Sequence, residues 1–311
     1  VLEQPEDYEY CYKIGGKIVP DPYGKAFSGR EHWSVSKGKE KRTLRTRIVT
    51  DTFDWGKSQF PHLKKEDVIA YSLHVRGFTA HASSNVSARG TYAGIVEKIP
   101  YLKDLGITAV ELMPVTEFDE IMMSSSGSGF HNAKQEPTGY LNYWGYGPSY
   151  LYAVKTAYAS RETMSAEGEF KTLVKELHKA GIECIPEIYF TGKELPGEIL
   201  SVLRYWAEEY HVDGFHLSGF PDLSLAAEDP FLRRTKLFAE NWNEVMNRRP
   251  KQGYITPGDG VVSVEEKNLA EYNMQFMEDM RRFLKGDEGM LSAFEFRNRR
   301  NPAADAVINY M

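Results

Sequence analysis

From residue 68 onward, short apolar runs alternate with segments whose apolar residues recur at helical spacing. Residues 68–75 predict one strand, and residues 107–113 predict the next. Between them lies a helical face made of Ile95, Ile99, Leu102 and Leu105. Gly106 predicts the end of this helix, and Pro100 inside it predicts a kink or a late helix start. Such an alternation is typical of an α/β protein with a parallel sheet.

The same strand–helix unit recurs down the chain. Further helical faces are expected around 170–177, 199–210 and 277–284. Strands are expected at 182–189, 213–217, 235–239, 268–271 and 306–310. Seven strands fit either a (β/α)8 barrel that lacks its last unit or a doubly wound open sheet, and the periodicity alone does not separate these folds.

The first sixty residues follow a different pattern. Residues 8–14 alternate, Gly15 and Gly16 offer a two-residue turn, and 17–19 resume the alternation, which predicts a β-hairpin. From 20 to 61 the chain is polar and irregular. The basic run at 37–47 is expected to be a solvated face. This part is predicted to be the end of a small β domain and a linker.

Composition excludes several classes of function. The net charge of −6 argues against nucleic-acid binding, because phosphate contacts need a basic face. No apolar run is long enough to cross a membrane, and the eight histidines show no metal-ligand spacing, so we expect no metal and no cofactor. Aromatic residues make up 13% of the chain, and their rings suit the flat faces of sugars. Without an apparent leader we expect a cytoplasmic protein, although a chain that starts at Val1 is expected to be a fragment.

Five motifs resemble the α-amylase superfamily, glycoside hydrolase family 13, and its isoamylase, pullulanase and glycogen-debranching branch. They are HVRGFT (74–79), YLKDLGI (101–107), ELMPV (111–115), NYWGY (142–146) and YWAEEYHVDGF (205–215). The resemblance implies a (β/α)8 TIM barrel over residues 63–311, incomplete at the C-terminus, with its site at the C-terminal ends of the strands. Residues 1–62 are then expected to be the remnant of a β-sandwich carbohydrate-binding module with a linker.

The family's nucleophile position is altered in this chain. The family writes Gly-Phe-Arg-x-Asp after the fourth strand, and this chain has GFHLS (214–218). Ser218 therefore stands where the resemblance implies the nucleophilic aspartate, and His216 stands where it implies the arginine. An unactivated serine hydroxyl is a poor nucleophile and cannot offset an oxocarbenium charge. We expect weak or no hydrolysis.

Of the family's other two catalytic carboxylates, one is matched by a residue of this chain and one is not. AENW (239–242) resembles the family's proton-donor segment and implies that Glu240 is the acid. The third carboxylate of the family lies beyond the seventh strand, past the last residue of this chain.

The third strand also departs from the family pattern. Glu187 replaces an aspartate, Thr191 an asparagine, and Gly192 the histidine that binds sugar in the family. Only 193–198 separate this strand from the next helix, so part of the cleft wall is expected to be missing. Glu187 and His216 either contact each other as a joint replacement of a family ion pair or changed independently, and the sequence leaves both interpretations open.

Tyr146 and Trp144 are the predicted sugar-binding aromatics. The resemblance implies that Tyr146 stacks under the sugar at the cleavage point, whereas a Trp and a Tyr beside Gly145 are also typical of loop packing.

Three hypotheses follow. In the first, the chain is debranching-type by descent, catalytically impaired, and binds α-glucan such as glycogen or starch. In the second, it is an active hydrolase or transferase in which Glu240 acts as acid and Glu187 or another carboxylate, roughly 5–10 Å from it, is recruited as base or nucleophile. In the third, an old barrel serves a non-carbohydrate partner. The sequence favours the first hypothesis and does not reveal the oligomeric state.

Overall fold

The computed structural model describes residues 3–33, 44–50, 53–123, 137–160, 165–219, 221, 225–226, 229–239 and 268–285. The chain divides into two compact units. One unit holds Val1–Leu237 and Ser263–Leu269, and the other holds Phe238–Val262 and Ala270–Met311. Each unit is described by itself.

The predicted N-terminal hairpin is confirmed. Strands β2 (Tyr12–Ile14) and β3 (Lys17–Val19) pair antiparallel. Gly15 and Gly16 join them with φ of 55° and 79°, and a two-residue turn with positive φ at both positions fits the twist of the paired strands.

The expectation of irregular chain from 20 to 61 is wrong in part. A three-stranded antiparallel sheet has the order β1-β5-β4. Its strands are β1 (Glu9–Tyr10), β4 (Ala26–Ser28) and β5 (Arg45–Arg47). Strands of two or three residues are too short to show an alternating pattern, so the sequence did not reveal them. The basic residues that fall in β5 lie on a strand whose central Thr46 is buried.

A parallel sheet forms the centre of the larger unit. Five strands follow in the order β14-β13-β12-β7-β6. The five are β6 (Ala70–Leu73), β7 (Ala109–Leu112), β12 (Glu183–Phe190), β13 (Gly214–Gly219) and β14 (Lys236–Ala239). Neighbouring pairs from β6 to β13 are parallel. The strands predicted at 68–75, 107–113, 182–189, 213–217 and 235–239 are therefore confirmed, with shifted ends.

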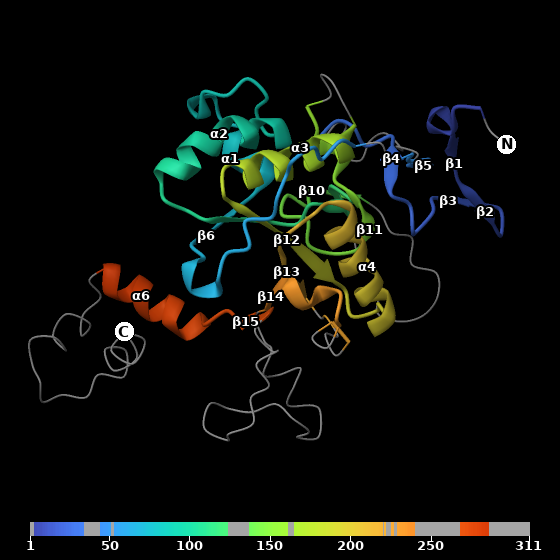
Figure 1. Ribbon diagram of the computed structural model, residues 1–311. Coiled ribbons are helices and arrows are strands. Elements are labelled where there is room, and N and C mark those ends of the chain that lie inside the picture. Colours follow the sequence, from blue (N-terminus) through green and yellow to red (C-terminus); the bar gives the residue numbers. More distant parts are fainter. Residues whose placement is uncertain are drawn as a thin grey trace, which may run out of the picture. The chain divides into compact units, whose positions relative to one another are not determined.

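Three long helices lie outside the strands that they connect (Figure 1). They are α2 (Tyr92–Asp104), α3 (Ala166–Lys179) and α4 (Pro196–Glu209). Gly106 and Gly181 follow α2 and α3 with φ of 80° and 75°, which confirms them as helix ends. A late start of α2 at Pro100 is wrong: the helix begins at Tyr92, because the Thr91 hydroxyl accepts the Gly94 N–H and caps it.

Aromatic side chains join these helices into one core. Phe170 of α3 packs edge to face on Tyr92 of α2, with ring centroids 5.3 Å apart, and on Trp206 of α4 at 5.5 Å. The Trp206 indole N–H donates to the carbonyl of Leu151 at 2.7 Å, so this fully buried ring has its polar atom satisfied.

The long connection between β7 and α3 is not simply a loop. It contains β8 (Thr116–Phe118), β9 (Ile121–Met123), β10 (Pro137–Leu141) and β11 (Ser149–Val154). Strand β11 pairs antiparallel with β8, and β10 with β9. No strand was predicted in this connection from the sequence.

Short helical turns complete the described part of the larger unit. They are η1 (Pro5–Asp7), η2 (Lys65–Asp67), α1 (Val75–Thr79), η3 (Ala82–Ser84), η4 (Thr156–Tyr158) and η5 (Leu232–Arg234).

The smaller unit contains most of β15 (Leu269–Glu271) and all of α6 (Met274–Lys285), which agrees with the strand and helix predicted there. The predicted strand at 306–310 and the helix end at Gly286 lie outside the described residues. Among the helices that are described, none has the length and apolar character needed to span a membrane.

Candidate functional site

Three neighbouring strands contribute acidic or basic side chains to one buried group on the same face of the sheet. Glu187 on β12 is in register with His216 on β13, and Glu111 on β7 is in register with Ile185, two residues before Glu187. Because side chains two residues apart on a strand share a face, these registers bring the three side chains together.

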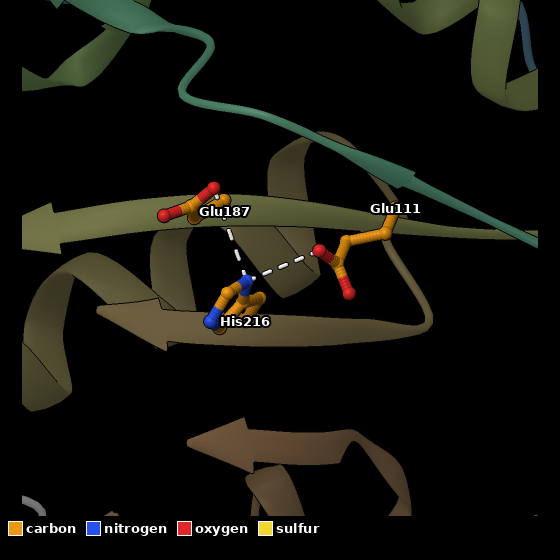
Figure 2. A group of neighbouring side chains, drawn as sticks. All are labelled: Glu111, Glu187 and His216. Carbon is orange, nitrogen blue, oxygen red and sulfur yellow. Dashed lines mark hydrogen bonds and ion pairs between the residues drawn. The ribbon is translucent and has the colours of Figure 1, made fainter. Parts of the chain in front are cut away.

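His216 lies between the two carboxylates. Its Nδ1 is 3.2 Å from Oε1 of Glu111 and 3.8 Å from Oε2 of Glu187, and Figure 2 shows this one nitrogen facing both acids. All three side chains are buried, with Glu187 only 2% exposed. The Glu187–His216 contact that the sequence left open is therefore present. Its partner Glu111 was missed, although a glutamate inside the apolar run 107–113 is the signal that marks it.

Burial dominates the electrostatics of Glu187. It raises the pKa of this carboxyl above its ordinary value, and the charge of Glu111 raises it further. His216 and the hydroxyls of Ser218 and Tyr146 act in the opposite direction without cancelling it. The net effect favours the protonated form of Glu187 relative to an exposed glutamate.

Ser218 completes the buried group. It lies two residues after His216 on β13 and is 6% exposed. Its hydroxyl lies near enough to Glu187 to lower the pKa of that carboxyl, yet it makes no hydrogen bond of ordinary geometry to the described residues. The position that the resemblance assigns to a nucleophile thus holds a buried hydroxyl.

Tyr146 borders the same group from the loop before β11. Its hydroxyl donates to Oε2 of Glu187 at 3.4 Å, a long hydrogen bond, and its ring is 41% exposed. Asn142 fixes the loop, since its side chain donates to the Tyr146 carbonyl at 3.0 Å and accepts the Gly145 N–H at 3.2 Å. A half-exposed ring anchored beside buried acids is a suitable platform for a sugar face.

Trp144 is placed differently. Its half-exposed ring packs edge to face on Tyr143 and on His74, with centroids 5.3 and 5.8 Å apart. The contacts of Trp144 therefore lead toward α1, and its predicted role in sugar binding stays a prediction.

The segment after β12 is a tight turn. The Glu194 carboxylate accepts bonds from the Thr191 hydroxyl and from the backbone N–H groups of Gly192 and Lys193, at 2.8–3.1 Å. Helix α4 begins at Pro196, so the connection is as short as the sequence predicted. Glu240, the predicted acid, lies outside the described residues.

A cavity of about 430 Å³ lies at the opposite ends of the strands. Its lining includes Glu183 and Lys236, the first residues of β12 and β14. Lys236 Nζ contacts both oxygens of Glu183 at 2.6 and 2.7 Å, and Asp213, also in the lining, contacts His178 at 2.9 Å. Because these charges neutralise one another, we assign this cavity a structural role.

His74 caps α1 next to the Tyr146 loop and has to be neutral there. Its Nδ1 accepts the Gly77 N–H at 2.9 Å, and its Nε2 lies 2.8 Å from the Tyr143 carbonyl, which fixes the proton on Nε2. Protonation would place a second hydrogen against the Gly77 N–H. Burial lowers the pKa of His74 below its ordinary value.

We therefore expect stability to fall in mild acid. A base whose folded-state pKa is depressed contributes stability above the unfolded value of about 6.5, and that stability is lost as pH falls toward the folded-state pKa. In urea unfolding at steps from about pH 7 to about pH 5, the free energy of unfolding should fall less in His74→Asn than in the wild type. Asparagine keeps a capping acceptor but does not titrate in this range. His81→Asn is the control, because His81 caps η3 in the same way but is exposed. If the free energy of unfolding depended on pH equally in His74→Asn and the wild type, this account would be contradicted.

The arrangement restricts the chemistry. Two buried carboxylates and one imidazole can bind a cation or share a proton. The described residues at this site place a hydroxyl, not a carboxylate, at position 218, so the two-carboxylate geometry of a retaining glycosidase is not built here from β13.

Comparisons with known proteins agree with the resemblance. Residues 76–188 match the family described as alpha amylase, catalytic domain. Isoamylase 3, chloroplastic, of Oryza sativa subsp. japonica is 30% identical over 93% of this chain and 45% of that protein. The glycogen operon protein GlgX homolog of Haemophilus influenzae is 29% identical over 93% of this chain and 52% of that protein. The chain spans about half the length of these curated relatives.

A solved structure shows the same fold. The structure of the pullulanase SAP of Group B Streptococcus, in complex with maltotetraose, aligns with a TM-score of 0.62 and 19% identity. The alignment covers 93% of this chain and 43% of that one. The debranching branch of the α-amylase family is therefore the group to which this chain is related.

Proposed function

Because this chain is a relative of the α-amylase family in its isoamylase and pullulanase branch, we propose that it binds α-glucan and hydrolyses it poorly or not at all. The ligand is a linear or branched α-linked glucose polymer of the glycogen or starch class. A cytoplasmic location stays a prediction of the sequence.

The proposal includes the architecture. The parallel sheet and its outer helices are the first part of a (β/α)8 barrel, and residues 1–62 are the end of a β-sandwich carbohydrate-binding module. Three features support this architecture. Strands alternate with helices along the chain, as in a (β/α)8 barrel, and the candidate site lies in the C-terminal half of the strands. A three-stranded antiparallel sheet lies in the N-terminal region.

The proposal that hydrolysis is weak or absent rests on the group of side chains around Ser218. A glycosyl–enzyme intermediate needs an exposed carboxylate at this strand end. Ser218 supplies a buried hydroxyl instead, and the neighbouring carboxylates of Glu111 and Glu187 are engaged with His216. The serine has no base aligned on it by a hydrogen bond of ordinary geometry.

The glucan-binding part rests on Tyr146. Its ring is half-exposed, its backbone is held by Asn142, and its hydroxyl contacts the buried acids. The maltotetraose in the related pullulanase structure supports an oligosaccharide of this class as ligand. Loss of a nucleophile leaves such an aromatic platform intact.

The second candidate is a hydrolase that recruits Glu187. As base or nucleophile Glu187 would have to be ionised and accessible, whereas burial raises the pKa of its carboxyl and the residue is 2% exposed and in contact with His216. A water or sugar would have to displace its neighbours, so binding without cleavage is the better-supported function.

The test is a binding and a hydrolysis assay on the same purified chain. Affinity electrophoresis through glycogen or pullulan should retard the wild-type protein, while no reducing ends appear. Tyr146→Ala is expected to weaken binding about tenfold, since the loss of one aromatic–sugar stack amounts to about 1.4 kcal/mol.

Tyr140→Ala is the matched control. Tyr140 is a 73% exposed tyrosine on β10, in a neighbouring segment of the same connection, so its loss should leave retardation unchanged. Reducing ends released at rates ordinary for glycosidases would establish the second candidate. Absence of retardation by every α-glucan would overturn the binding function and favour a non-carbohydrate partner.

A further inference from the structure

The group of Glu111, Glu187 and His216 brings two carboxyl groups and one imidazole together, each on a residue less than a tenth exposed. If both carboxyls are ionised, the three side chains carry two negative charges with a neutral imidazole and one with an imidazolium. Buried carboxylates are normally paired or bound to a metal. A divalent cation bound to two carboxylates and a neutral imidazole would balance the charge.

The distances suit a metal of small radius. One ligand atom from each residue lies within 4.8 Å of the other two, and His216 Nδ1 is 3.2 Å from Glu111 Oε1 and 3.8 Å from Glu187 Oε2. Tetrahedral Zn²⁺ holds nitrogen and oxygen ligands at about 2.0–2.2 Å, so its ligand atoms are about 3.3–3.5 Å apart. Small side-chain adjustments would convert the observed spacing into that geometry, and Figure 2 shows both acids linked to the same His216 nitrogen.

Ser218 gives a second, independent indication. Its hydroxyl is buried, lies on the same face of β13 as His216, and makes no hydrogen bond of ordinary geometry to the described residues. A buried hydroxyl is normally bonded. A water on the fourth position of a bound metal would be a partner for it, as it would for the nearby Tyr146 hydroxyl.

We propose that Glu111, Glu187 and His216 bind one divalent transition-metal ion of the Zn²⁺ class, with an open fourth position toward Ser218. The imidazole and the small site favour zinc over Ca²⁺ and Mg²⁺, which prefer six or more oxygen ligands. The metal needs both carboxyls ionised and Nδ1 of His216 free of hydrogen, so any proton that these three groups hold in excess of a neutral imidazole is released to solvent on binding. This site is independent of the proposed glucan function and can be tested without any sugar.

The competing interpretation is a purely proteinaceous ion cluster, in which a protonated His216 takes the place of the arginine that the family resemblance implies. The two interpretations differ in what an arginine at this position would do. A guanidinium carries its own permanent charge and pairs well with two carboxylates. His216→Arg should therefore fold normally and exclude the metal.

The experiment uses the whole chain, stripped with a chelator and titrated with Zn²⁺ against a chromogenic chelator. We expect one zinc per chain, and one Co²⁺ that gives the intense visible absorption of tetrahedral cobalt. Glu187→Gln and His216→Arg should lower zinc affinity by more than about 100-fold, because each removes a direct ligand. Zinc should raise the melting temperature of the wild type and not that of His216→Arg.

His178→Gln is the matched control. His178 is a buried histidine paired with a carboxylate, Asp213, on the larger unit but away from Ser218. It should retain full zinc stoichiometry. If zinc bound His216→Arg as tightly as it binds the wild type, the ion would be bound elsewhere on the surface. If the wild type took up no stoichiometric zinc, the group would be an ion cluster of protein side chains without a metal. Either result overturns the proposal, and His216→Arg keeps the test valid if Glu187→Gln fails to fold.

Discussion

Replacing Lys155 by methionine is expected to lower the free energy of unfolding by about 3–5 kcal/mol, because it leaves buried carboxylates without the positive charge that pairs with them. Lys155 is fully buried, and its Nζ lies 2.8 Å from Glu117 and 3.0 Å from Glu120, both also buried. It donates as well to the Phe118 carbonyl at 3.0 Å. Methionine fills a similar volume, so the loss would measure charge and hydrogen bonding rather than a cavity.

The measurement is urea unfolding, with Lys179→Met as the control. Lys179 pairs with Glu176 three residues away on the exposed face of α3, and such surface pairs contribute little. We expect a change within about 0.5 kcal/mol for Lys179→Met. A loss below about 1 kcal/mol for Lys155→Met would show that the β8–β11 pair does not depend on this cluster.

This cluster explains how the Tyr146 platform is held. Glu117 lies on β8, and its second oxygen accepts the Thr156 N–H at 2.7 Å. Lys155 directly follows β11, whose start is preceded by the Tyr146 loop. The polar cluster therefore links β8 to the end of β11, and the Tyr146 loop lies between these two strands in the sequence.

The sheet and its helices were predictable because their patterns are local. A buried parallel strand is an apolar run, and an outer helix shows an apolar face every three to four residues, as in α3 with Phe170, Leu173, Val174 and Leu177. Glycines with positive φ mark the helix ends. Pro100 misled the prediction because the Thr91 cap, nine residues earlier, is the stronger signal.

The strands β8 to β11 were missed for a physical reason. Each is at most six residues long, and the paired residues lie 14 to 38 positions apart in the chain, so no local period reports these strands. Their stability comes from Lys155 and from contacts such as Phe27 on Tyr150, with ring centroids 4.4 Å apart. Neither is a property of the segment itself.

The candidate site was predictable residue by residue but not as a group. The resemblance named Glu187, His216, Ser218 and Tyr146, and the structure brings these four together. It also adds Glu111, which no spacing rule finds, since its neighbours come from other strands. The expectation of no metal rested on spacing along the chain, and the proposed ligand set was not visible there because side chains gathered from three parallel strands have no fixed spacing. The boundary predicted between residues 62 and 63, and the role of Glu240, stay predictions.

The second large effect is expected at the glycine that shapes the Tyr146 loop. Gly145 has φ of 85°, and a Cβ there would lie 2.6 Å from Cε1 of the fully buried Phe118 and 3.0 Å from Cβ of Pro114. Gly145→Ala therefore combines a backbone penalty of about 1–2 kcal/mol with a core overpacking penalty of about 1–3 kcal/mol. We expect a total loss of roughly 2–5 kcal/mol in urea unfolding.

Gly139→Ala separates the two contributions to this loss. Gly139 has φ of 78°, nearly that of Gly145, but a Cβ there meets nothing within 4 Å. It should show the backbone penalty alone, so the difference between the two variants measures the clash with Phe118. Because the Gly145 N–H is held by Asn142, which also holds the Tyr146 carbonyl, Gly145→Ala should weaken glucan retardation about as much as Tyr146→Ala, whereas Gly139→Ala should not. Equal stability losses in both glycine variants, with retardation unchanged in both, would mean that the loop adapts and that Tyr146 is not held in place by its neighbours.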